Sequence, residues 1–363
     1  MKTSKQSDKI PFSHDAINDF LAHFEGHQEC GIAAQSLYTP PQSVDNKKLR
    51  HTDFCPNRAR LLESMSTGGR HGFDAPYRPA DCHFRWYTTP EICMILERFD
   101  GVVFIGDDML QSIYAAFNIL LRQDLATGAM KQWELEDEEK NACRCDNQII
   151  RPQCFQRRIL DSASVGGSKS GGEGLSTPYF CSRSPHFFLP ISGSPAPDDL
   201  HERFTALLRA DSDSYKSIPV IHTLGLSTTL SWPLATDSMD EWVSLADTSG
   251  RNVPFLWVGP NSAGHLKPPG QILGEGNNAL WHYTIEMAME ARSRELDALG
   301  MYNLTLQASS WDGSGYGLRV GLVQAMMKGQ EDEFGKLQHV IELVLGELHR
   351  QCRDIEQNGV SIE

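Results

Sequence analysis

The chain has 363 residues, of which 40% are hydrophobic, and it carries a formal net charge of −14 at pH 7. This length is sufficient to bury a substantial hydrophobic core. The acidic balance argues against nucleic acid or an anionic membrane as the main partner, so a small-molecule substrate or a protein remains.

Two features of the sequence bear on localisation. No stretch approaches the roughly 20 consecutive apolar residues that a membrane span needs. The polar residues 1–9 also lack the apolar core of a signal peptide. We therefore expect a cytoplasmic protein with no membrane partner.

Nine cysteines stand at positions 30, 55, 82, 93, 143, 145, 154, 181 and 352. For a cytosolic chain we favour reduced, buried thiols that pack as small hydrophobic side chains, with disulfide bridges as the alternative. Cys143, Cys145 and Cys154 lack the paired spacing and the partner histidine of a zinc site. We therefore expect no metal and no other cofactor.

The first third of the chain predicts one strand and the helices beside it. Residues 1–98 mix short apolar runs with turn residues, which indicates an irregular wrapping segment after a helix at 13–24. A buried strand is predicted at 101–105, followed by an amphipathic helix at 109–123.

The remainder of the chain predicts a sheet with crossover helices over residues 99–330. A Gly/Ser-rich stretch near 162–176 indicates a flexible surface insertion. Further strands are predicted at 218–224, 253–258 and 302–307, each separated from the next by enough residues for a crossover helix. This spacing predicts a single α/β domain over residues 1–363, a three-layer α/β/α sandwich with a mainly parallel sheet.

The C-terminal residues 331–357 have apolar side chains three or four positions apart. This spacing predicts an amphipathic helix. We expect the helix to pack on the sheet, with a homodimer contact as the alternative.

The strand at 101–105 runs into Gly106, Asp107 and Asp108. Backbone N–H groups at the start of the following helix favour negative charge, which is the setting of an oxyanion hole. Two adjacent carboxylates repel each other, and this repulsion can produce an acid or base that works near neutral pH. Asp107 can instead cap the helix.

This strand and turn resemble the nucleophile motif of the SGNH (GDSL-type) hydrolases, and more closely their PC-esterase branch. That branch includes plant and fungal polysaccharide O-acetyl esterases and transferases, in which the turn reads Gly-Asp-Ser and the serine is the nucleophile. Here Asp108 stands in the serine position, and Gln111 replaces an arginine that usually follows three positions later. Upstream, residues 81–87 and 91–93 resemble the cysteine and Arg-Trp segment of the branch.

Two downstream blocks extend the resemblance. Residues 257–261 resemble the block whose glycine and asparagine complete the oxyanion hole, which assigns that role to Asn261. Residues 311–315 resemble the late Asp-x-x-His block, with Asp312 retained and Gly315 where the histidine would stand. The relatives are largely secretory or luminal proteins in which cysteines can be bridged.

Because serine acyl transfer needs both a hydroxyl and a positioned base, the loss of both predicts very low esterase activity. A donor-lined pocket can still hold a flexible substrate and polarise a carbonyl. The leading hypothesis is a cyclase or isomerase, including a pericyclase of Diels-Alderase type, and the resemblance to fungal members implies natural-product biosynthesis. The alternatives are an O-acyl esterase or acyltransferase that uses another serine, and a catalytically dead ligand-binding protein. Candidates for that serine are Ser112, Ser309, Ser310 and Ser314.

The candidate site residues follow from these blocks. The predicted catalytic residues are Asp107, Asp108, Asn261 and Asp312. The predicted substrate-binding residues are His265, Lys267, His282, Trp311 and Tyr316. In the esterase alternative, His265 or His282 would act as the base. Structural roles remain open for each of these side chains.

Overall fold

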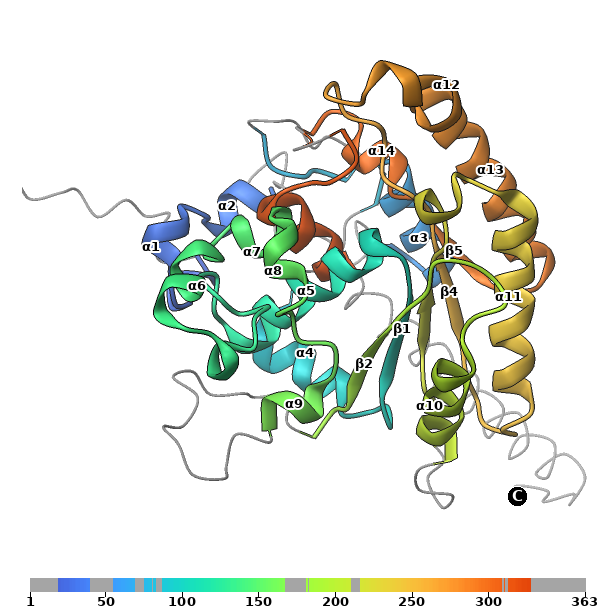
Figure 1. Cartoon of the computed structure of the whole chain (residues 1–363), viewed down its shortest axis with the longest axis horizontal. Coiled ribbons are helices and arrows are strands. Elements are labelled where there is room, and N and C mark those ends of the chain that lie inside the picture. The colour runs from blue at the N-terminus through green and yellow to red at the C-terminus, as the bar shows by residue number, and fades with distance from the viewer. Residues whose placement is uncertain are drawn as a thin grey trace, which may run out of the picture.

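The computed structural model describes residues 19–39, 55–68, 75–79, 81–82, 87–166, 181, 183–209, 216–308, 310 and 313–327. It is a mixed α/β structure with one five-stranded sheet in which all strands are parallel (Figure 1). The strands lie in the order β2–β1–β3–β4–β5. Their bounds are β1 Val102–Gly106, β2 His186–Pro190, β3 Val220–His222, β4 Phe255–Val258 and β5 Asp297–Leu299.

Helices fill most of the chain between these strands. The α-helices are α1 His27–Cys30, α2 Ala34–Leu37, α3 Arg58–Ser66, α4 Thr89–Leu96, α5 Asp108–Arg122, α6 Asp137–Ala142, α7 Asn147–Ile150, α8 Pro152–Phe155, α9 Ser162–Gly166, α10 Asp198–Arg209, α11 Trp232–Asp247, α12 Ile272–Glu275, α13 Asn277–Ser293 and α14 Tyr302–Thr305. The 3₁₀ helices are η3 Gln132–Glu134, η5 Leu226–Thr228 and η6 Pro269–Gln271. Residues 318–327 are also helical.

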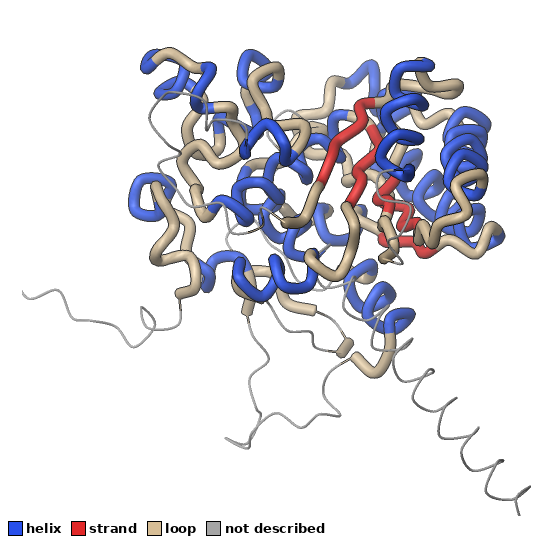
Figure 2. Tube along the Cα trace, turned by 90° about the horizontal axis from the view of Figure 1, so that it is seen from below, coloured by secondary structure: helices blue, strands red, loops and turns tan. Residues whose placement is uncertain are grey.

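Strand β1 is the central element of the fold. Every one of its residues is buried, and it pairs with β2 on one edge and β3 on the other. Val103 packs in an apolar cluster with Trp242 of α11, whereas Phe104 packs against Phe117 of α5. Because successive side chains of a strand point to opposite faces, both faces of the sheet are buried against helices (Figure 2).

Most of the predicted sheet is confirmed. The strands predicted at 101–105, 218–224 and 253–258 correspond to β1, β3 and β4, and the helix predicted at 109–123 corresponds to α5. The strand predicted at 302–307 is wrong, because α14 occupies this position and β5 lies just before it. The Oγ1 atom of Thr305 lies 2.9 Å from the carbonyl oxygen of Met301 and 3.1 Å from that of Tyr302, contacts that fit a helical turn. Strand β2 was not predicted.

The N-terminal third is more regular than the sequence indicated. Helices α3 and α4 occur where an irregular wrap was predicted. Helix α4 begins with a capping box, in which Glu91 accepts a hydrogen bond of 2.8 Å from the backbone N–H of Thr88. Of the helix predicted at 13–24, residues 20–23 form a turn and residues 13–18 lie outside the described residues.

Two further predictions fall largely on undescribed residues. In the insertion predicted near 162–176, residues Ser162–Gly166 form α9, and 167–176 lie outside the described residues. The C-terminal helix predicted at 331–357, with its alternative homodimer contact, also lies outside them. None of the described helices combines the length and apolar character that a bilayer crossing needs.

The prediction of reduced, buried thiols is wrong for the described cysteines. Eight of them form four disulfides: Cys30–Cys145, Cys55–Cys82, Cys93–Cys181 and Cys143–Cys154. Their Cα atoms lie 4.9 to 5.8 Å apart, which is the normal range for a bridge. The ninth, Cys352, lies outside the described residues. Because disulfides persist mainly in oxidising compartments, the bridges do not support the expected cytoplasmic location.

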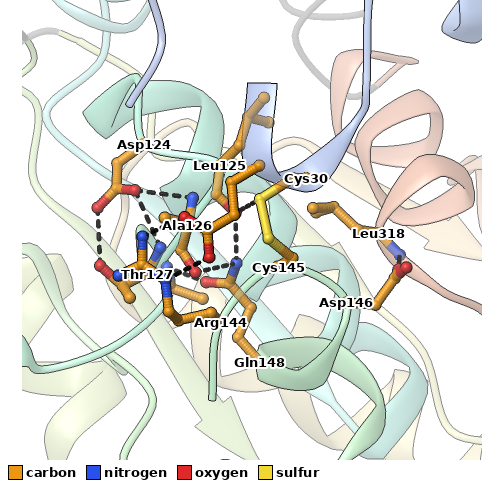
Figure 3. The surroundings of a disulfide bond; sticks show 12 residues. Cys30, Asp124, Leu125, Ala126, Thr127, Arg144, Cys145, Asp146, Gln148 and Leu318 are labelled. Atoms are coloured by element: carbon orange, nitrogen blue, oxygen red, sulfur yellow. Dashed lines mark hydrogen bonds and ion pairs between the residues drawn. A yellow bond between two sulfur atoms is a disulfide. The ribbon is translucent and has the colours of Figure 1, made fainter. Parts of the chain in front are cut away.

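The Cys30–Cys145 bridge joins the N-terminal segment to the turn before α7, and Cys145 donates a backbone hydrogen bond of 2.8 Å to Ala126 in the adjacent turns (Figure 3). Gln148 fixes these turns by accepting a hydrogen bond of 2.9 Å from the N–H of Ala129. Asp146, next to the bridge, accepts a hydrogen bond of 2.6 Å from the N–H of Leu318. The bridge therefore lies in a network that reaches the C-terminal part of the described chain.

Removal of individual bridges provides a test of this pairing. Replacing Cys30 and Cys145 with serine is expected to lower the free energy of unfolding by about 5 kcal/mol, and replacing Cys143 and Cys154 by about 3 kcal/mol. The first bridge closes a loop of 115 residues and the second a loop of 11, so the first restricts the unfolded chain more. Urea unfolding measures the losses, and non-reducing peptide mapping checks the pairs. Free thiols at these four positions would contradict the pairing.

Candidate functional site

A cavity of about 340 Å³ lies at the carboxyl ends of β1, β3 and β4. Ligands of parallel α/β sheets bind at this edge, because the loops that follow the strands meet there. The floor of the cavity is formed by residues that follow these strands: Asp107, Asp108, Met109, Leu226, Ser227 and Asn261. Its walls come from α7 and α8, from the segment 267–275, and from residues 314–324.

Gly106 allows β1 to turn sharply into α5. A Cβ atom at this position would lie 2.8 Å from both the backbone oxygen of Thr223 and the Cδ2 atom of Leu110. No larger residue fits without displacing β3 or α5. The glycine therefore brings the start of α5 against the end of β3.

Asp107 is the N-cap of α5, which confirms its predicted capping role. Its Oδ1 accepts a hydrogen bond of 3.1 Å from the N–H of Met109, and its Oδ2 accepts one of 3.2 Å from the N–H of Gly225. Burial raises the pKa of the Asp107 carboxyl to about 6, against the lowering effect of these N–H groups. The negative charge of Asp108 contributes to the rise.

Asp108 is the first residue of α5, is exposed, and lines the cavity. Within the described part of the chain its carboxylate forms no salt bridge. The charge of Asp108 acts on the buried guanidinium of Arg158, which lies 3.8 Å from the ring centre of Phe155. Burial lowers the pKa of Arg158 to about 9, and the charge of Asp108 acts in the opposite direction. Asp108 is thus a carboxylate available to a ligand.

Asn261 follows β4 and is buried at the floor of the cavity. Its Oδ1 accepts a hydrogen bond of 2.6 Å from the Nε2 of Gln324. In this orientation of the amide, Nδ2 has no partner among the described residues. The free N–H groups can donate to a carbonyl oxygen of a ligand.

Lys267 is buried in the cavity wall and is already paired. Its ammonium lies 2.6 Å from Oε2 of Glu275 and donates to Oγ of Ser314 at 3.0 Å. Gly313 allows its own segment to approach the backbone of Lys267 closely. Its φ is +93°, and a Cβ there would lie 2.3 Å from the backbone nitrogen of Lys267. Lys267 thus acts as a donor that joins Ser314 to the Glu275 carboxylate.

Tyr316 lines the cavity and is held by Ser262. Its hydroxyl lies 2.8 Å from the Oγ of Ser262 and donates to the Ser262 carbonyl oxygen at 2.9 Å. Gly315 also lines the cavity, at the position where the resemblance expects histidine. Trp311 and Asp312 lie outside the described residues.

The histidines lie elsewhere. His265 and His282 are exposed and do not line the cavity. His186 in β2 and His222 in β3 are core residues, and burial lowers the pKa of each to about 3. Among the described residues, none of the side chains that line the cavity is an imidazole.

No protein-family model matches the chain, and no curated protein matches it.

The structure therefore brings Asp107, Asp108, Asn261, Lys267 and Tyr316 together around one cavity. It separates them from His265 and His282.

Sequence reasoning missed several contributors to the site. Gly225 and Ser227 follow β3, where a Gly-Leu-Ser turn after an apolar run was a weak signal. Gln324 gave no signal, because it lies 63 positions from Asn261 and only the fold brings them together. Phe155 belongs to a wall built from two short helices that were not predicted.

The pKa of Asp107 predicts a pH dependence of stability. Between its ordinary value of 3.8 and about 6, the unfolded chain has lost this proton while the folded chain keeps it. Stability from the neutral carboxyl is therefore fully present below about pH 4 and is lost as the pH rises through about 6. We compare the unfolding free energy of the wild type with that of Asp107→Asn. The wild type minus variant difference is expected to fall by about 3 kcal/mol from pH 3.5 to pH 7.

Urea unfolding across this range, with disulfides intact, measures the effect. The exposed Asp237 on α11 supplies the control variant Asp237→Asn, for which the relative stability should show no comparable fall. If the difference in unfolding free energy between the wild type and Asp107→Asn does not change with pH, the raised pKa of Asp107 is refuted.

Proposed function

We propose that the cavity binds a small carbonyl compound and catalyses a non-hydrolytic rearrangement of it, as a cyclase or isomerase. The observation that carries the proposal is the pair formed by the exposed carboxylate of Asp108 and the amide N–H groups of Asn261, which line the same cavity and have no partner among the described residues. A base and a carbonyl-polarising donor are the minimum that enolisation requires.

The proposed mechanism uses these two groups in turn. Asn261 Nδ2 donates to the substrate carbonyl oxygen, which makes the neighbouring C–H more acidic. Asp108 takes that proton, and the C–H electron pair forms the enolate double bond. In a β,γ-unsaturated carbonyl compound, the proton returns from Asp108 to the γ-carbon of the dienolate and gives an isomer. Attack of the enolate carbon on a second carbonyl carbon of the same molecule instead gives a ring, and the alkoxide that forms takes the proton back from Asp108.

The positive end of α5 favours the enolate. Backbone N–H groups in the first turn of a helix stabilise negative charge that develops beside them. Closure of the cavity around one conformation of the substrate would supply further rate acceleration through proximity. A pericyclic reaction of Diels-Alderase type would use the same donor and shape without the proton transfer.

The scaffold we infer for this chemistry is the three-layer α/β/α sandwich of the SGNH hydrolases, with the nucleophile and histidine positions altered. The parallel sheet, its two buried faces and the site at the ends of β1, β3 and β4 support this inference. Four disulfides favour folding in an oxidising compartment. Fungal natural-product biosynthesis is the context that the sequence resemblance suggests.

A serine O-acyl esterase or acyltransferase is the second candidate, and the contact between Ser314 and Lys267 favours it. Its weakness is that the side chain of Lys267 is already engaged by Glu275 at 2.6 Å. Ser112 is less suitable, because its hydroxyl donates to the backbone oxygen of Asp108 at 3.0 Å.

Enolisation can be tested without knowledge of the natural substrate. We expect the wild type to incorporate deuterium at the α-carbon of members of a panel of cyclic ketones and β-keto esters in D₂O, as followed by NMR. Asp108→Asn should lower the exchange rate by about 10²–10⁴-fold and Asn261→Ala by about 10²–10³-fold. Asp237→Asn is the matched control and should exchange at the wild-type rate. Equal exchange by the wild type and Asp108→Asn would refute the assigned base.

A gain-of-function variant tests the inferred scaffold. Asp108→Ser combined with Gly315→His restores the two altered positions in one cavity, so this variant should react with a fluorophosphonate probe and hydrolyse p-nitrophenyl acetate. The wild type should do neither. Labelling of the wild type that disappears in Ser314→Ala would instead support the esterase.

A further inference from the structure

Two buried amide side chains meet at the floor of the cavity. Asn261 and Gln324 both line it, and they are only 5% and 2% exposed. The Nε2 of Gln324 donates to Oδ1 of Asn261 at 2.6 Å, which uses one acceptor and one donor of the pair. Nδ2 of Asn261 and Oε1 of Gln324 have no partner among the described residues. Buried amide atoms in this state require a partner from a ligand or from solvent.

These two atoms face the cavity. Some buried side-chain atoms of the described chain lack both a partner and contact with solvent, but Nδ2 of Asn261 and Oε1 of Gln324 are not among them. Because both residues are almost wholly buried and line the cavity, the cavity is where these atoms meet solvent. The floor therefore presents one hydrogen-bond donor and one acceptor side by side.

The bond between the two amides preserves this donor and acceptor. Exchanging the nitrogen and oxygen of one amide alone would set two donors or two acceptors against each other. Exchanging them in both amides keeps the bond and again leaves one donor and one acceptor toward the cavity.

Both amides lie on supported backbone. The N–H of Ser262, next to Asn261, donates to Oγ1 of Thr305 at 2.8 Å. Gln324 lies on the helix of residues 318–327, most of whose apolar side chains pack in the largest core cluster. A donor and an acceptor in fixed positions select a ligand by the spacing of its own polar atoms.

A carbonyl group with a hydrogen-bond donor close beside it matches this pair. An α-hydroxy ketone and a primary amide both have this arrangement. In an amide, the nitrogen lone pair delocalises onto the carbonyl group, which makes the neighbouring C–H less acidic. The hydroxy ketone is therefore the better substrate for a carboxylate base such as Asp108. The charge of Asp108 also disfavours a ligand that carries its own carboxylate.

We propose that the substrate is a neutral α-hydroxy carbonyl compound, whose carbonyl oxygen accepts from Nδ2 of Asn261 and whose hydroxyl group donates to Oε1 of Gln324. This inference rests on the proposed function for removal of the proton by Asp108. Gln324 determines specificity by binding the hydroxyl group on the carbon that the proton leaves. It takes no part in the proton transfer.

Three related ketones test the inference. Hydroxymethyl phenyl ketone has the hydroxyl group, propiophenone has a methyl group in its place, and methoxymethyl phenyl ketone has the oxygen without the hydrogen. The wild type should bind the first about three- to tenfold more tightly than either of the others, because only the first can donate to Oε1. NMR titration measures the affinities. Equal affinity for hydroxymethyl phenyl ketone and propiophenone would overturn the inference.

The variant Gln324→Met removes the acceptor at similar side-chain size, so this preference should fall to about one. Affinities are compared within each variant, so a uniform loss caused by Asn261 does not affect the result. The matched control is Gln271→Met, which replaces an exposed glutamine of the cavity wall and should keep the preference. A preference that persists in Gln324→Met, or that is lost only in Gln271→Met, would refute the role of Gln324.

Benzamide tests the other ligand class, because it offers the same pair of polar atoms without an α-hydrogen. It should bind no more tightly than hydroxymethyl phenyl ketone. Tighter binding of benzamide, lost in Gln324→Met, would assign the two atoms to a primary amide ligand and contradict the hydroxy ketone.

Deuterium exchange separates this inference from the proposed function. Asp108→Asn should keep the preference for the hydroxyl group and lose exchange at the α-carbon of hydroxymethyl phenyl ketone in D₂O. Wild-type exchange without the preference would overturn this inference alone, whereas the preference without exchange would overturn the assigned base. If none of the three ketones binds, the proposed carbonyl site fails and this inference fails with it.

Discussion

The carboxylate of Asp107 connects the two strand ends on which the cavity depends. It accepts one hydrogen bond from the first turn of α5 and one from Gly225 after β3. These bonds compensate in part for the burial of the group, which still holds its pKa near 6. Because Gly106 leaves no room for a side chain, β1 turns into α5 directly against the end of β3. Asp108 is then presented to the cavity as the first residue of the helix.

The remaining walls are fixed by contacts between distant segments. The Cys143–Cys154 bridge closes the loop that holds α7 and α8, and Cys30–Cys145 ties this loop to the N-terminal segment. Asp146 holds the backbone at Leu318, beyond the loop that carries Gly315 and Tyr316. Rigid walls suit a site that works by positioning and by oriented donors, because such catalysis loses efficiency when the geometry relaxes.

Local patterns were sufficient for the central elements. The apolar run of β1, the Gly106 turn and the amphipathic α5 were predicted closely, because a buried parallel strand is apolar throughout and a surface helix has one apolar face. The same reasoning failed for α14, where a short alternating run fits one helical turn as well as a strand. It also missed α4, although the Thr88–Glu91 capping box was visible in the sequence.

The sequence by itself determined the parallel α/β class, the place of Asp107 and Asp108 at a helix start and the acidic character of the protein. These follow from interactions between residues close together in the chain. The tertiary structure alone decided which cysteines pair, which amide group orients Asn261, and that His265 and His282 lie away from the cavity while Lys267 lines it. Such contacts join residues that are far apart in the chain, and the free energy that selects them comes from packing of the whole core, which no local pattern records.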